Sequence, residues 1–119
     1  MKWITENMHW LIGFLSIWTL GNGILHDVFV LLERKPYERE LIRLLIDGHI
    51  LIFSGLLYGV CWYFLKEYPR PMLVLCLLNA VFMLGYCLLI FKMLPSWGMI
   101  GLSVLMIAAA SLTLLSTSK

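Results

Sequence analysis

The chain has 119 residues, of which 61% are hydrophobic and 13% charged, with a formal net charge of +2. Soluble domains carry about a quarter charged residues, so a mean hydropathy of +0.90 favours a protein embedded in lipid. The small net charge, without a basic run interleaved with aromatic residues, excludes nucleic acid as a predicted partner. Cys61, Cys76 and Cys87 lie in apolar runs without paired spacing, so no disulfide framework is predicted.

Four segments are long and apolar enough to cross a bilayer, which takes about 20 residues. We expect helices over residues 8–32, 41–65, 72–93 and 96–115 of one domain. The first segment lacks the small-residue cleavage site of a signal peptide, so we expect a retained helix. Connections this short make neighbouring helices antiparallel. The sequence therefore predicts an all-α, up-down-up-down four-helix bundle in a membrane, with both termini on the same side.

Prolines and charges mark the connections between these segments. Pro69 and Pro71 suit the first turn of the third helix and Pro95 the start of the fourth, because proline lacks an N–H that a first turn does not use. Arginine and lysine slightly favour the side of the charged turn at residues 33–40. The positive-inside rule therefore places this turn in the cytoplasm, and a bacterial protein of this kind in the inner membrane.

At about 100° per residue, each predicted helix carries one stripe of polar or small side chains. On the first helix the stripe runs through Thr19, Gly23 and His26, and on the second through Asp47 and Ser54. Lipid cannot satisfy polar groups, so we expect the stripes to face each other inside the bundle. Helix packing without further function is an alternative reading of these stripes, because small residues commonly line helix contacts.

The candidate site lies in the hairpin at residues 20–50, where His26 and Asp47 fall about 10 Å inside the charged turn. Ionisable side chains at such depth indicate a functional site by default. We expect a polar pocket here. Its candidate ligand-binding or polar-core residues are Asn22, His26, Asp27, Arg43, Asp47, His49, Asn79 and Tyr86. A plainer alternative stays open, in which Arg43 neutralises Asp47 and His26 only bonds across the helix pair.

Helical geometry limits which candidates can converge. Asp47 and His49 point about 200° apart on their helix, so both cannot face one pocket. Haem held by His26 and His49 is an alternative that this divergence disfavours, and neither a metal nor another cofactor is predicted. No motif of an activated nucleophile is present, so a binding protein is expected before an enzyme. Acid–base or redox chemistry at a His26/Asp47 pocket stays an alternative.

The layout resembles small four-helix membrane proteins of the DoxX-like family. Gly21 and Asn22 lie near the far end of a long first helix before a charged connector, and Pro95, Gly98 and Gly101 open the last helix. In outline the chain is also similar to the four-helix scaffold protein of ergosterol synthesis. The resemblance implies a scaffold or a quinone-linked oxidoreductase subunit, and it assigns no catalytic residue.

These observations predict a small integral membrane protein with one of two roles. It acts as an accessory or scaffold subunit, or it binds a lipophilic molecule such as a lipid or quinone in a polar-lined bundle interior. The expected partners are membrane lipid and either a larger membrane complex or further copies of the chain. A membrane enzyme or enzyme subunit is the alternative.

Overall fold

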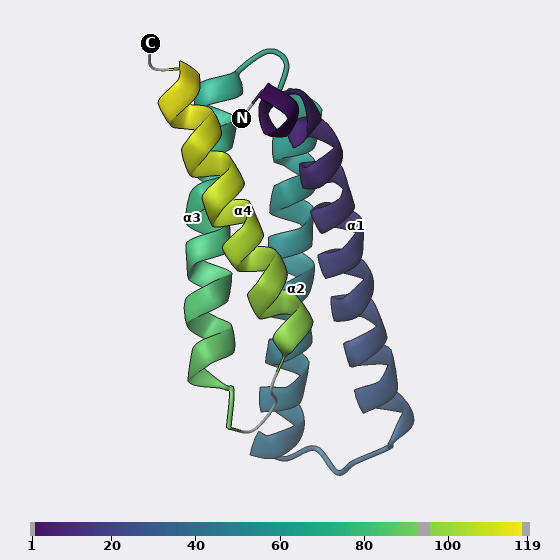
Figure 1. The fold of residues 1–119 in the computed structure, drawn as a ribbon. Coiled ribbons are helices and arrows are strands. Elements are labelled where there is room, and N and C mark those ends of the chain that lie inside the picture. Colours follow the sequence, from purple (N-terminus) through teal and green to yellow (C-terminus); the bar gives the residue numbers. More distant parts are fainter. Residues whose placement is uncertain (1, 93–95, 118–119) are drawn as a thin grey trace.

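The protein is all-α, as predicted, and consists of helices that are each long and apolar enough to span a membrane. A computed structural model describes residues 2–92 and 96–117, with side chains over 7–92 and 96–116. The helices are α1 (Lys2–Leu32), α2 (Arg39–Phe64), α3 (Pro69–Leu89) and α4 (Trp97–Thr117). In Figure 1, α1 begins and α4 ends at the end of the molecule where α2 joins α3. The helices lie side by side along a body 55 Å long.

Some helices begin or end at other residues than we predicted. The predicted ends followed apolar composition, whereas glycine, proline and backbone hydrogen bonds decide where a helix starts and stops. We placed the first helix from residue 8, but α1 begins at Lys2, because neither glycine nor proline interrupts residues 2–7. α3 begins at Pro69 rather than at residue 72, with the prolines in its first turn as expected, and it ends at Leu89 rather than at residue 93. There the Phe91 N–H donates to the Leu88 carbonyl, which tightens the last turn. The predicted role of Pro95 lies outside the described residues.

Glycines let α1 and α2 approach until their backbones touch. A Cβ built on Gly23 would lie 2.8 Å from the Gly48 carbonyl oxygen, and one on Gly55 would lie 2.5 Å from the Leu20 backbone nitrogen. Ser16 fastens the same contact, since its hydroxyl donates to the Gly55 carbonyl oxygen over 2.8 Å. Small residues are the usual means by which membrane helices pack this closely. Gly55 and Gly59 form a G-x-x-x-G signal for this contact in the sequence.

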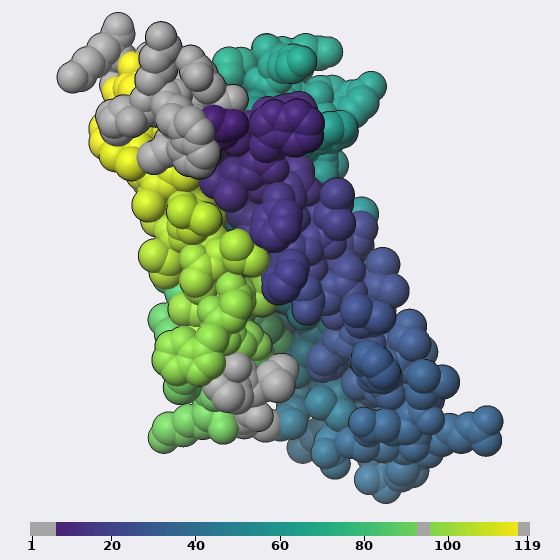
Figure 2. All heavy atoms as spheres, turned by 45° about the vertical axis from the view of Figure 1, so that its right-hand side comes forward, coloured from purple at the N-terminus to yellow at the C-terminus, as the bar shows by residue number. Residues whose placement is uncertain are grey.

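The bundle contains two closely packed helix pairs, α1 with α2 and α3 with α4, which meet along looser α2–α3 and α1–α4 seams. Figure 2 shows the face where α1 (purple to blue) lies against α4 (yellow to green), with the charged connector projecting at the lower end. The main core lies in the half nearer the chain ends and includes Ile12, Tyr58, Cys76 and Met106. Towards the charged connector, a smaller cluster of Met83, Cys87 and Met99 replaces it.

The outer surface is covered by large apolar side chains. Phe29, Phe53 and Phe82 are each more than 60% exposed, on three different helices. Soluble monomers rarely expose continuous apolar patches larger than a few hundred Å². Lys35 lies outside the helices, within 3.3 Å of Glu33 and 3.9 Å of Glu40. Lys66, Glu67 and Arg70 lie at the opposite end, where α2 joins α3. The arrangement fits a multi-pass membrane protein, with an apolar exterior and charged connections at both ends.

The close contact between α1 and α2 at Gly55 leads to a prediction about stability. Gly55→Ala forces the new methyl group against the α1 backbone, and we expect it to lower the free energy of unfolding by about 1–3 kcal/mol. Gly21→Ala is the matched control, because a Cβ there meets nothing within 4 Å and alanine favours the helix by about 1 kcal/mol. Helix content followed during titration with sodium dodecyl sulfate measures both variants. Equal stability of the two would contradict the close backbone contact.

Candidate functional site

Two polar contacts join α2 to α3 along their looser seam. The Ser54 hydroxyl donates to the Asn79 Oδ1 over 2.9 Å, and the Asn79 amide donates back to the Ser54 carbonyl oxygen over 3.0 Å. Nearer the charged connector, the Tyr86 hydroxyl donates to the Asp47 carboxylate. Two helical turns, about 10 Å, separate these contacts on each helix. They hold α2 and α3 together where apolar packing is thin.

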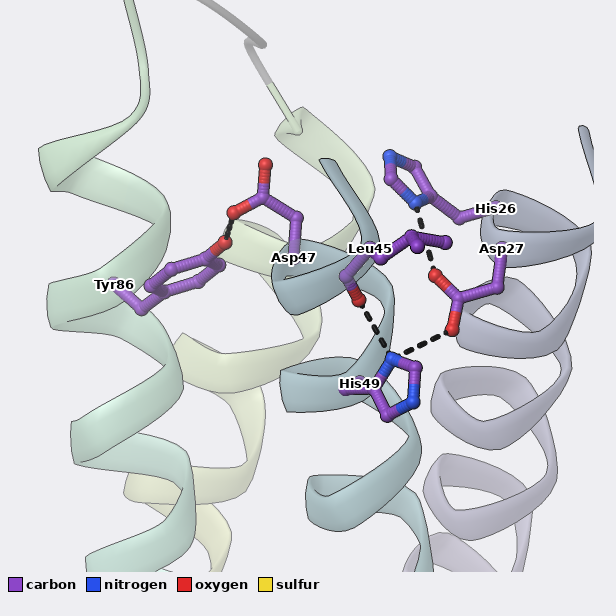
Figure 3. Close-up of polar contacts among 6 residues, drawn as sticks. All are labelled: His26, Asp27, Leu45, Asp47, His49 and Tyr86. Atoms are coloured by element: carbon purple, nitrogen blue, oxygen red, sulfur yellow. Dashed lines mark hydrogen bonds and ion pairs between the residues drawn. The ribbon is translucent and has the colours of Figure 1, made fainter. Parts of the chain in front are cut away.

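A second cluster lies between α1 and α2 and is centred on Asp27 (Figure 3). The Asp27 Oδ2 is 2.9 Å from the Nδ1 of His49, and its Oδ1 is 3.7 Å from the Nδ1 of His26. Only 12% of the Asp27 side chain is exposed, against 71% of the His49 side chain. A nearly buried carboxylate on α1 thus holds an exposed imidazole on α2.

Gly48 makes room for this carboxylate. A Cβ at residue 48 would overlap the Asp27 carboxylate, so any other residue there would displace it. The neighbours of Gly48 point in different directions. Asp47 turns towards α3 and His49 towards α1 (Figure 3). The divergence of about 200° predicted for these two side chains agrees with this arrangement.

The Nδ1 atom of His49 carries a proton in this geometry. It lies 2.7 Å from the Leu45 carbonyl oxygen, which can only accept a hydrogen bond. The Asp27 Oδ2 lies 2.9 Å from the same nitrogen. A neutral His49 ring therefore has its lone pair on Nε2. Within the described residues, the polar contacts of this ring are made through Nδ1.

The structure does not bring the candidate residues of the predicted polar pocket together, because they fall into separate clusters. Asn22 is exposed, and its amide donates to the Trp18 carbonyl oxygen of its own helix over 2.7 Å. Arg43 is also exposed and lies with Arg39 and Glu40 around a shallow depression at the start of α2. His26 and Asp47 belong to different contacts, one at Asp27 and one at Tyr86.

On α1 the inward position belongs to Asp27 rather than to His26. The buried face of this helix runs through Leu15, Thr19, Gly23 and Asp27 at four-residue steps. His26 lies about 100° away and is half-buried at the edge of that face. The stripe that we predicted was therefore one residue out of register at its far end.

An open groove runs along the outside of the α2–α3 seam, with a volume of about 440 Å³. This lies within the range of about 300–1,000 Å³ typical of small-molecule sites. Its lining is almost wholly apolar, with His49 at the end nearer the connector and Ser54 and Asn79 at its side. The lining residues are Ile46, His49, Ile50, Phe53, Ser54, Leu57, Leu75, Leu78, Asn79, Phe82 and Met83.

Our sequence reading missed most of this groove, because its members look like ordinary lipid-facing residues. A usable signal was the recurrence of Ile46, Ile50, Phe53 and Leu57 on one face of the second segment, flanked by a histidine. Apolar periodicity of this kind cannot separate a groove from a smooth lipid-facing surface. Whether such a face forms a groove or a smooth surface depends on where the neighbouring helix lies.

The arrangement of the two histidines bears on the haem alternative. Both Nδ1 atoms face the same Asp27 carboxylate, one at each oxygen, rather than facing each other across an open space. Axial haem ligands instead lie on opposite faces of one macrocycle. Among the described residues, no group of three or more His, Cys, Asp or Glu side chains is arranged to hold a metal ion.

Comparison with protein-family models, curated proteins and solved structures gives no match to the chain. The likeness in layout to DoxX-like proteins therefore stays a prediction. The functional argument rests on the geometry of this chain.

A double-mutant cycle tests the inner α2–α3 contact. Removing both partners with Ser54→Ala and Asn79→Ala is expected to show a coupling of about 0.6–2 kcal/mol in unfolding free energy, since hydrogen bonds between membrane helices have this size. The control cycle pairs Ser54→Ala with Asn22→Ala, whose amide bonds within α1. That cycle should be additive within about 0.5 kcal/mol. Additivity in both cycles would show that Ser54 and Asn79 do not interact.

Proposed function

We propose that the protein is a multi-pass membrane protein that binds a lipophilic molecule, and that the groove between α2 and α3 is the binding site. The helices would form an up-down-up-down bundle with both termini on one side of the membrane. The charged connector would face the cytoplasm, as the positive-inside rule suggests. The site differs from our sequence-based proposal, because the ligand lies on the side of the bundle rather than in its interior.

The observation that carries this proposal is a groove whose walls and surroundings are both apolar. From Ile46 to Leu57 it follows α2 for about 16 Å at 1.5 Å per residue, so it suits an extended hydrocarbon chain. The groove opens onto the apolar exterior formed by residues such as Phe53 and Phe82. A lipophile could therefore enter sideways from the bilayer without crossing water.

The two polar contacts of the seam support a binding role. Ser54–Asn79 and Asp47–Tyr86 bridge α2 and α3, and the groove lies beside these bridges on the same seam. A preformed groove binds its ligand without the free-energy cost of opening. An accessory or scaffold role in a larger membrane complex stays a prediction, and the bound lipophile is compatible with it.

An enzymatic role at His26 and Asp47 finds less support in this geometry. The two side chains belong to different clusters and point to different helices (Figure 3). General acid–base catalysis needs its groups within hydrogen-bond reach of one substrate. The proposal therefore assigns binding, and no reaction, to this protein.

Blocking the groove tests the proposal. Leu78→Trp places an indole in the groove, and we expect it to lower photolabelling of α2 by a diazirine-bearing alkyl lipid in phosphatidylcholine nanodiscs. About ten lost contacts of about 0.1 kcal/mol each correspond to roughly fivefold lower occupancy. Peptide mass spectrometry locates and counts the label.

Leu88→Trp is the matched control. Leu78 and Leu88 are leucines of α3 that are 59% and 57% exposed, but only Leu78 lines the groove. The control should label as the unmodified protein does. Labelling spread evenly over the lipid-facing helices, and unaffected by either variant, would refute the groove as a binding site.

A further inference from the structure

We infer that the occupant of the groove between α2 and α3 is a membrane lipid with a negatively charged phosphate headgroup, and that Arg39 and Arg43 hold this headgroup. This inference rests on the proposed function and adds the chemical class of the ligand. Its starting point is the end of the groove nearer the charged connector. There Ile46 is the first lining residue on α2, and Arg43 lies three residues before it.

The two arginines share one face of α2 with the apolar lining of the groove. This face consists of Arg39, Arg43, Ile46, Ile50, Phe53 and Leu57, which recur at alternating steps of four and three residues. At about 100° per residue, their side chains fall within about 80° around the helix. The face is therefore charged at its first two positions and apolar at the rest, in the order of a lipid headgroup and its hydrocarbon chain.

A shallow depression lies at the arginine end of this face. It has a volume of about 450 Å³ and is lined by Arg39, Glu40 and Arg43. Among the described residues no ion pair involves Arg39, whereas Glu40 lies 3.9 Å from Lys35, which offsets its negative charge. Guanidinium groups bind phosphate oxygens through paired, charge-assisted hydrogen bonds. Two arginines one turn apart therefore favour an anionic phosphate here.

The position of the arginines along α2 matches that of a headgroup in the membrane. α2 begins at Arg39, directly after the charged connector, and Arg43 lies one turn farther along between apolar residues. Long basic side chains near the ends of spanning helices extend to the membrane surface, where lipid headgroups lie. The chain of a lipid held there would run from Ile46 towards Leu57, for about 16 Å along α2.

The property that these arginines can distinguish is the net charge of the headgroup. In phosphatidylcholine a quaternary ammonium group offsets the phosphate, whereas phosphatidylglycerol carries a phosphate without a compensating cation. One arginine near a membrane surface favours an anionic lipid about fivefold, so two together favour it roughly ten- to thirtyfold. The preference between two lipids with identical chains is therefore large enough to measure.

The test uses the full chain in phosphatidylcholine nanodiscs. Phosphatidylglycerol and phosphatidylcholine probes that carry the same diazirine-bearing chain are titrated, with labelled groove peptides as the readout. We expect the phosphatidylglycerol probe to label the groove at roughly ten- to thirtyfold lower concentration. Arg39→Gln combined with Arg43→Gln should abolish this preference, while both probes still label the groove.

Arg34→Gln combined with Lys92→Gln is the matched control. Arg34 follows α1 and Lys92 follows α3, at the end of the molecule where α2 begins (Figure 1). Both side chains are exposed, and neither lines the depression. The control removes the same amount of positive charge and should keep the preference. If both double variants lose it equally, the preference comes from general surface charge, and the inference fails.

The direction of the bound lipid provides a second readout. A diazirine next to the headgroup should label the part of the groove near Ile46, and one at the end of the chain should label the part near Leu57. The reverse order would place the headgroup away from the arginines and would overturn the inference. Because this measurement uses the unmodified protein, it decides alone if altered helix content shows that the double arginine variant does not fold.

The remaining outcomes separate the inference from the proposed function. If neither probe labels the groove, the proposed function fails. If both probes label it at the same concentration in the unmodified protein, the groove binds lipophiles without selecting an anionic headgroup, and only the inference fails. Inorganic phosphate, compared with chloride at the same ionic strength, should leave the labelling unchanged. If it displaces the phosphatidylglycerol probe, the arginines bind free phosphate rather than a lipid headgroup, and again only the inference fails.

Discussion

A polar side chain within an apolar exterior has to find its hydrogen-bonding partner inside the protein, and this constraint arranges the half of the bundle nearer the charged connector. An unsatisfied polar group costs several kcal/mol in such surroundings. Asn79 meets Ser54 and Asp47 meets Tyr86, whereas the Asp27 Oδ1 and the His26 Nδ1 are buried without a hydrogen-bond partner among the described residues. The two hydrogen-bonded contacts each join α2 to α3, so satisfying these groups also determines which faces of these helices meet.

α2 is joined to α1 and to α3 in two different ways. Along α1 and α2, glycines bring the backbones together, and nothing larger than a hydrogen atom fits at Gly23 and Gly55. Along α2 and α3, polar side chains bridge a wider gap at two levels. The α2–α3 groove lies beside these bridges, and a second hollow of about 460 Å³ lies over the α1–α2 contact, lined by residues such as Gly13, Ser16 and Gly59. Both ways of joining helices therefore leave space on the outside of α2, and the α2–α3 groove is the one with polar bridges at its side.

The sequence predicts the helices well and the site only in part, for a physical reason. Apolar length and the prolines at Pro69 and Pro71 are local signals, so the number and approximate ends of the helices follow from them. Which of His26 and Asp27 faces inward depends on a rotation of about 100°, and helical periodicity over a polar stripe leaves that rotation ambiguous. The groove requires knowing that α3 lies beside one particular face of α2, which no local pattern encodes.

The segment Asp47–Gly48–His49 shows how much of the site three adjacent residues determine. Asp47 bonds to α3, Gly48 leaves the space that the Asp27 carboxylate fills, and His49 leans back to that carboxylate from the outer surface. Successive side chains on a helix point about 100° apart, so adjacent positions can meet different neighbours. The three residues therefore connect α2 to α3 on one side and to α1 on the other within a single turn. A change in the rotation of α2 would break both connections together, so this turn fixes how α2 faces its two neighbours.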